Sequence, residues 1–237
     1  MSLTTLAALL VWGTLVGVDL VSAPQMMIAR PLVAGTVAGL LLGDVETGLR
    51  VGVVFELFQF DVLPVGAVRY PEYGPATIAA VVLAHGMGGT SALGIAAGVG
   101  LVLAVAGGVS LHWLRTVNTR VVRKAATALQ AGDPRVLARV HAGGLLRDAI
   151  IPDGPILLVD DTYRSVAVTA LGLAVATLGI RLGAAALPAP LLGATTVAVG
   201  GAALATGAMG LLRLVGRTSL PWLAAGLAAG LALVWLA

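Results

Sequence analysis

Residues 44–75 read DVETGLRVGVVFELFQFDVLPVGAVRYPEYGP, and this segment decides the class of fold. It places Glu56 inside the apolar run VGVVFELFQF. A charged side chain near the centre of a bilayer costs about 2.5–3.5 kcal/mol, so a residue in this setting needs a partner or a function. We therefore expect a membrane protein whose chemistry lies around Glu56.

Glu56 and Gln59 form a polar pair, because residues three apart share one face of a helix. The chain's three phenylalanines surround this pair: Phe55, Phe58 and Phe60. Carboxylate and amide groups bind sugar hydroxyls, and flat apolar surfaces contact the C–H faces of a sugar ring. The pattern thus favours a sugar site that includes Glu56, Phe58 and Gln59. The alternative is that Glu56 pairs with an arginine, such as Arg50 or Arg69, and only stabilises the helix bundle.

The end of this segment breaks the helix. Pro64 and Gly66 follow soon after Asp61, and a proline lacks the N–H that would continue a helix. In a bilayer, the freed backbone N–H and C=O groups are tolerated where they line a cavity. We therefore add Asp61 and Gly66 to the predicted substrate-binding residues.

The composition of the whole chain excludes a soluble globular domain. Of its 237 residues, 59% are hydrophobic and only 11% are charged, against about 25% charged in an ordinary soluble domain. Four long runs contain no Asp, Glu, Lys or Arg: 73–114, 165–180, 182–212 and 218–237. Since about 20 apolar residues cross a bilayer, the chain is predicted to be an all-α polytopic membrane protein with about six to eight membrane segments.

Several of these segments are short or divided. The runs at 3–18 and 31–43 are too short for an upright crossing, so we expect tilted, broken or re-entrant helices there. The run at 73–114 is long enough for two crossings. Three glycines mark the turn between them: Gly86, Gly88 and Gly89.

A basic segment follows this run. Residues 114–147 hold seven of the chain's 14 basic residues and a single acidic one, Asp133. Positive charge beside membrane helices lies on the cytoplasmic side, so we expect a basic cytoplasmic loop at 114–150. Gly132 as a helix stop and Pro134 as a first-turn proline predict two short surface helices within it. Topology also accounts for the net charge of +3, and no nucleic-acid partner is expected.

The sequence offers little for catalysis or metal binding. Cysteine is absent, and the three histidines do not have the spacing of metal ligands. Asp160 and Asp161 suggest a metal-dependent membrane transferase as a further alternative, but Asp153 is the only other carboxylate nearby. With Arg164 following in a polar segment, a solvated loop with an ion pair is the preferred interpretation. We expect no catalytic residue, no metal and no cofactor.

Residues 30–76, RPLVAGTVAGLLLGDVETGLRVGVVFELFQFDVLPVGAVRYPEYGPA, resemble the IIC subunits of the mannose/fructose/sorbose family of the bacterial sugar phosphotransferase system (PTS). That family has a similar arginine–proline–leucine start, glycine–aspartate turn and embedded glutamate–leucine pair. A glycine-containing segment and a proline–acid pair follow, here Pro71 and Glu72. A weaker likeness covers AGDPRVLARVHAGGLLRD at 131–148, so the resemblance spans residues 30 to about 150.

The resemblance implies one membrane-embedded domain over residues 1–237, with re-entrant hairpins and elevator-like movement. It implies a permease subunit of the bacterial cytoplasmic (inner) membrane that binds and moves sugar but is not an enzyme. The implied partners are a IID membrane subunit, in a trimer of IIC–IID pairs, and the soluble IIB and IIA phosphocarrier subunits. IIB would donate phosphate to the arriving sugar.

Individual positions also match. Glu56 matches the family's membrane-embedded glutamate, Gly43 and Asp44 match its structural turn, and Gly66 matches the glycine of its broken segment. Residues 58–61 differ, because the family is typically more aliphatic there and contains tryptophan. This difference leaves the identity of the sugar open. A small-solute transporter that is not coupled to phosphate is the alternative function.

Overall fold

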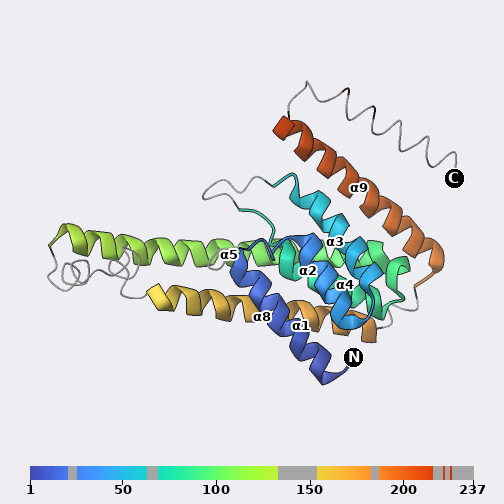
Figure 1. The fold of residues 1–237 in the computed structure, drawn as a ribbon, viewed down its shortest axis with the longest axis horizontal. Helices are drawn as coiled ribbons and strands as arrows, with labels where there is room; N and C mark the ends of the chain where they lie inside the picture. The colour runs from blue at the N-terminus through green and yellow to red at the C-terminus, as the bar shows by residue number, and fades with distance from the viewer. Residues whose placement is uncertain are drawn as a thin grey trace.

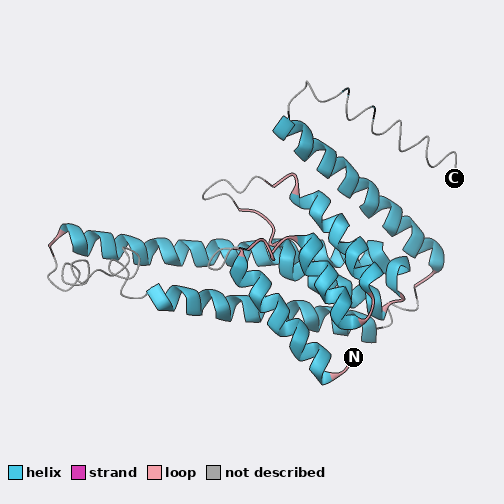
Figure 2. Ribbon diagram, in the orientation of Figure 1, coloured by secondary structure: helices cyan, strands magenta, loops and turns pink. Residues whose placement is uncertain are grey.

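The computed structural model describes residues 1–20, 26–62, 69–132, 154–182 and 187–215, with positions 221 and 225, and every regular element among them is helical (Figure 2). The prediction of an all-α protein is confirmed for these residues. The elements run in the order α1 (Leu3–Asp19), α2 (Pro31–Leu42), α3 (Val45–Gln59), α4 (Tyr73–Gly86), the 3-10 helix η1 (Gly89–Ala92), α5 (Leu93–Gln130), α8 (Gly154–Arg181) and α9 (Ala189–Val215).

Helix length separates the described elements into two groups. Three segments are long and apolar enough to cross a membrane: Gly89–Val117, Asp161–Arg181 and Ala189–Leu211. The apolar helices α1 and α2 are shorter, in agreement with the short runs noted in the sequence. The total of six to eight membrane segments stays a prediction, because most of the run at 218–237 lies outside the described residues.

α2 and α3 form a tight hairpin. Gly43 at its tip has a φ of +74°, which glycine adopts without strain, and Asp44 begins α3 by accepting a hydrogen bond from the Thr47 N–H at 3.1 Å. The two backbones touch along the hairpin, since a Cβ on Gly48 would lie 2.5 Å from the carbonyl oxygen of Gly35. Small residues therefore allow these short helices to pack at backbone distance.

α4 occupies the centre of the bundle. Every residue from Gly74 to Ala84 is buried, and the helix packs against α1, α2, α3, α5 and α8. A helix enclosed on all sides must be apolar all round, which explains why this part of the sequence lacks charge. Gly88 and Gly89, both with positive φ, make the predicted turn into η1 and α5.

The chain enters α4 at the middle of the long α5 span. The Glu72 N–H donates to the carbonyl oxygen of Ala104 at 2.8 Å, and Ala104 lies near the midpoint of the candidate span Gly89–Val117. α4 has 14 residues, which corresponds to about 21 Å, less than the roughly 30 Å of a bilayer's hydrocarbon core. The segment before α4 is therefore irregular backbone at membrane depth.

The basic segment begins as helix rather than loop. α5 continues without a break to Gln130, so residues 115–130 are part of one long helix, and the prediction of a separate short surface helix is wrong for them. Charged residues do not end a helix once it leaves the apolar region, because arginine and lysine are good helix formers. The predicted stop lies just beyond this end, where Gly132 has a φ of +70°. The rest of the segment, from Asp133 to residue 150, lies outside the described residues.

The segment expected as a solvated connection is also helical. α8 begins at Gly154, so residues 154–164 form its first turns. Figure 1 shows this part of α8 and the C-terminal part of α5 extending together beyond the rest of the bundle. The polar residues of this segment therefore lie on a helix that continues into the membrane-spanning part of α8.

Candidate functional site

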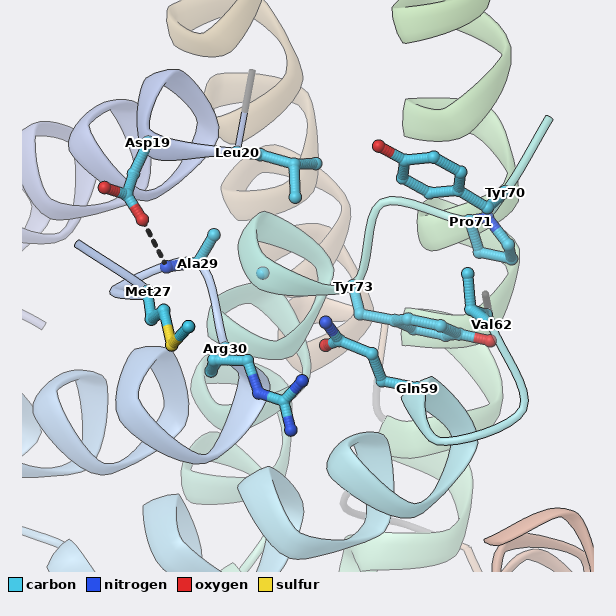
Figure 3. Close-up of a pocket in the computed structure, with 11 residues that line it drawn as sticks. Asp19, Leu20, Met27, Ala29, Arg30, Gln59, Val62, Tyr70, Pro71 and Tyr73 are labelled. Carbon is cyan, nitrogen blue, oxygen red and sulfur yellow. Dashed lines mark hydrogen bonds between the residues drawn. The ribbon is translucent and has the colours of Figure 1, made fainter. Parts of the chain in front are cut away.

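A cavity of about 480 Å³ lies where the ends of α1 and α3 approach the start of α4 (Figure 3). Its volume falls in the range of about 300–1,000 Å³ that is usual for small-molecule sites. The polar side chains and tyrosines that line it are Asp19, Arg30, Gln59, Tyr70 and Tyr73. Because the start of α4 lies at the level of Ala104, the cavity lies beside the middle of the candidate span Gly89–Val117.

Gln59 reaches the cavity from the last position of α3. Figure 3 shows its amide between Arg30 and Tyr73. Its carbonyl oxygen Oε1 is buried and has no hydrogen-bond partner among the described residues. A buried polar group without a partner costs about 1–3 kcal/mol. An open acceptor inside a cavity therefore indicates where a ligand donor can bind.

Tyr70, Pro71 and Tyr73 form one wall of the cavity (Figure 3). The Tyr73 ring packs edge-on to the buried Phe55, with centroids 6.0 Å apart and an interplanar angle of 66°. The Tyr70 hydroxyl accepts a hydrogen bond from Arg115, whose guanidinium also lies 4.7 Å from the Tyr70 ring centroid. Neighbours on α3 and α5 thus hold both rings.

Asp19, the last residue of α1, fixes another side of the cavity. Its buried carboxylate accepts backbone hydrogen bonds from Met26 at 2.6 Å and from Ala29 at 3.2 Å. Within this turn Met27 has a φ of 64°, an unusual value for a residue other than glycine. The two hydrogen bonds hold the turn that leads to Arg30.

Glu56 does not line the cavity itself but contacts Arg30, which does. Its carboxylate forms an ion pair with Arg30 and accepts a hydrogen bond from the Leu32 N–H at 3.2 Å. Glu56 therefore has an arginine partner, although not one that the sequence suggested. Arg50 pairs with Glu46 instead, at 2.6 Å.

The other predicted substrate-binding residues do not meet at the cavity. The Asp61 carboxylate accepts a hydrogen bond from Arg213 of α9 at 2.6 Å, and Phe58 packs against the hydrophobic core. Gly66 lies outside the described residues. Successive positions of a helix point about 100° apart, so residues adjacent in sequence to Gln59 face different neighbours.

The sequence did not predict a buried cluster of charged side chains next to the tyrosine wall, which is the wall formed by Tyr70, Pro71 and Tyr73. Arg164 of α8 donates to both carboxylate oxygens of Glu72, at 2.7 and 3.0 Å, and to Asp161 at 3.1 Å. The pairing of Asp161 with Arg164 is confirmed, but its solvated setting is wrong, because Asp161 is 1% exposed. One feature of the sequence could have indicated this cluster: Glu72 follows Pro71 and directly precedes the uncharged run at 73–114.

The Gly43–Asp44 turn lies at the opposite end of α4 from the cavity. Asp44 Oδ2 is 3.1 Å from Nδ1 of His85, which lies in the last turn of α4. This contact ties the tip of the α2–α3 hairpin to the central helix. Its place is consistent with a structural rather than a substrate-binding role.

These features define a membrane protein in which short helices end around a cavity of a size suited to a small molecule. Residues 3–189 match the family described as the PTS system sorbose-specific IIC component. The chain belongs to this family, and the family predicted from the sequence is thereby confirmed.

Individual relatives agree with this membership. The mannose-specific EIIC component of the PTS from Escherichia coli (strain K12) is 27% identical over 161 residues, which cover 67% of this chain and 59% of the relative. The sorbose-specific EIIC component from Klebsiella pneumoniae is 34% identical over 116 residues, covering 49% and 43%. The chain thus spans less than two thirds of the length of these curated relatives.

The fold also has a solved counterpart. A structure described as that of a membrane protein superimposes with a TM-score of 0.58 at 18% sequence identity, covering 97% of this chain and 87% of the other. At this identity the likeness concerns the fold alone.

Proposed function

We propose that this chain is the sugar-translocating IIC subunit of a mannose/fructose/sorbose-type phosphotransferase system and that the cavity binds the sugar. The observation that carries the proposal is the buried, unpartnered Oε1 of Gln59 in a cavity with a tyrosine wall. A sugar hydroxyl can donate to this oxygen while the ring packs against an aromatic face. Family membership and relatives named for mannose and sorbose support a sugar as the ligand.

The residues around the cavity would then have distinct roles. Gln59 contacts the sugar, and Arg30 offers hydrogen-bond donors whose direction Glu56 sets through the ion pair. The Arg30 guanidinium also lies 5.8 Å from the Phe60 ring centroid, which further limits its movement. Asp61 would support the site from outside by tying the end of α3 to α9.

The proposed partners follow from the IIC role. A IID membrane subunit completes the translocating complex, as a trimer of IIC–IID pairs in the bacterial inner membrane. Soluble IIB, recharged by IIA, donates phosphate to the sugar, so the IIC chain itself is not the enzyme. The helical extension of α5 with the exposed Arg120 and Arg123 supports docking of IIB on the cytoplasmic side.

The test is sugar uptake into membrane vesicles that contain this chain with its cognate IID and phosphorylated IIB. We expect sugar phosphate to accumulate, and Gln59→Leu to lower uptake at least about tenfold because one buried hydrogen-bond partner is lost. Arg50→Gln, which breaks only an exposed ion pair, is the matched control and should transport normally. Entry of unphosphorylated sugar would support an uncoupled transporter, and the absence of any sugar movement would refute the proposal.

A further inference from the structure

Arg164 lies behind the tyrosine wall and makes a two-point contact with Glu72. The two side chains are 8% and 0% exposed, and two guanidinium nitrogens each bind one carboxylate oxygen, at 2.7 and 3.0 Å. Such paired contacts fix orientation as well as distance. This contact links α8 to the described residues just before α4.

Glu72 is also fixed against α5. Its N–H donates to the carbonyl oxygen of Ala104 at 2.8 Å, and a Cβ added to Gly107 would lie 2.9 Å from its Oε2. The absence of a side chain at Gly107 therefore makes room for the Glu72 carboxylate. Arg164 extends the contact to α5 through the Ser110 hydroxyl at 3.3 Å.

The position of Glu72 controls the wall because of its neighbours in the chain. It lies between Pro71 and Tyr73, and both of these residues line the cavity. The residues just before α4 have no helical hydrogen bonds of their own, so contacts with α5 and α8 hold this segment. A shift of Glu72 would displace the wall on both sides of it.

We propose that Arg164 is a positioning residue for sugar binding, which acts through Glu72 to hold the Tyr70–Tyr73 wall in its binding geometry. This inference rests on the proposed function of the cavity. Lysine cannot replace arginine here, because its ammonium is a point charge that does not reproduce the two-point contact. If the cluster served folding alone, its function would require only that none of its three buried charges, on Glu72, Asp161 and Arg164, is left unpaired.

The first test measures the affinity of the purified complex with IID for mannose, fructose and sorbose. The double variant Glu72→Gln/Arg164→Gln is made in an Asp161→Asn background, because Arg164 also pairs with the buried Asp161; with all three charges of the cluster removed, it separates folding from positioning. We expect it to bind the transported sugar about tenfold more weakly, with the maximal transport rate within about twofold. Arg164→Lys should weaken binding by about fivefold. Arg50→Gln is the control, and wild-type affinity in the folded double variant would overturn the proposal.

The second test measures how accessible the wall is when no sugar is bound. The chain contains no cysteine, so Pro71→Cys introduces a unique, half-buried thiol. We expect its maleimide labelling rate to rise at least about fivefold when Glu72 and Arg164 are both changed to glutamine in the Asp161→Asn background. An unchanged rate would refute positioning. If labelling rises but the unmodified complex binds none of the three sugars, the positioning of the wall stands and the proposed function fails.

Discussion

Two arginine–glutamate pairs hold the walls of the cavity, and they differ in burial. The side chains of Arg30 and Glu56 are 40% and 13% exposed, whereas those of Arg164 and Glu72 are 8% and 0% exposed. The apolar residues that flank Glu56 in the sequence predicted that Glu56 is the charged side chain buried in the membrane. The glutamate that the fold encloses completely is Glu72, among prolines and tyrosines. Burial depends on neighbours in space, and sequence neighbours are only part of them.

The difference has consequences for what each pair can do. A half-exposed arginine can exchange one hydrogen-bond acceptor for another, so Arg30 can turn from Glu56 toward a ligand at modest cost. A buried pair has no such exchange, because water cannot replace a lost partner there: without Arg164 the Glu72 carboxylate is uncompensated, and without Glu72 the guanidinium keeps only Asp161 as a carboxylate partner. The pair at Arg30 is therefore suited to binding, and the pair at Arg164 to fixing geometry.

The largest effect is expected from Glu72→Ala. It removes two charge-assisted hydrogen bonds from the buried Arg164 guanidinium, which keeps Asp161 as a carboxylate partner, and this should destabilise the protein by about 3–5 kcal/mol. Reversible denaturation in mixed micelles measures this change. The variant Glu72→Ala/Arg164→Met/Asp161→Asn, which removes all three charges of the cluster, should recover part of the loss. A cost below about 1 kcal/mol for the single variant would remove the distinction between the two pairs.

A smaller effect is expected from Glu56→Gln. The Arg30 side chain loses a charged acceptor but keeps access to its surroundings, so the expected loss is about 1–2 kcal/mol. The accumulation of sugar phosphate should fall by more than this small loss of stability alone would cause, because Arg30 loses its orientation in the cavity. The two readouts are the denaturation midpoint and the accumulation of sugar phosphate in vesicles. Unchanged accumulation would exclude Glu56 from the transport mechanism.

Gln59→Leu should move stability in the opposite direction. It removes the buried acceptor that has no partner among the described residues, so we expect a gain of about 1 kcal/mol together with the loss of transport. Gln59→Glu is a useful comparison, since it keeps the shape and adds a charge at membrane depth. Loss of stability in Gln59→Leu would indicate that Oε1 is satisfied in the resting protein.

The smallest effect is expected from Glu46→Gln. Glu46 and Arg50 form an exposed i,i+4 pair with side chains 68% and 57% exposed. Such pairs contribute about 0.3–0.5 kcal/mol in helices, so the denaturation midpoint and uptake should both stay close to those of the unmodified chain. If Glu46→Gln lost as much stability as Glu56→Gln, the exposure of the side chains would not predict how much each of the three pairs contributes to stability.

Much of the architecture could be predicted from hydropathy alone. The short apolar helices, the glycine turn after α4 and the helix stop near Gly132 all follow local rules for length and backbone conformation. The continuation of α5 as one unbroken helix was not predicted, because the sequence favours separate short surface helices in the basic segment, and the helical start of α8 was not predicted, because its polar residues favour a solvated loop. Arginine and lysine are good helix formers, so a charged stretch of sequence can remain helical.

The candidate site was predicted only in part. Gln59 lies in the cavity and Glu56 touches it through Arg30, while Phe58 and Asp61 face the core and α9. Proximity in sequence cannot decide which way each side chain of a helix end points.

The amino-acid sequence was enough to predict an all-helical membrane protein of the PTS IIC family. The apolar runs predict the helices, and the glycine–aspartate and glutamate–leucine motifs indicate the family; all of these are local properties of the chain. The tertiary structure alone decided which charges are enclosed and which residues share the cavity. Arg164 and Glu72 are 92 positions apart in sequence and meet at 2.7 Å. Such a contact arises from the packing of α8 and α5 around the start of α4, and packing depends on the surfaces of all three elements together.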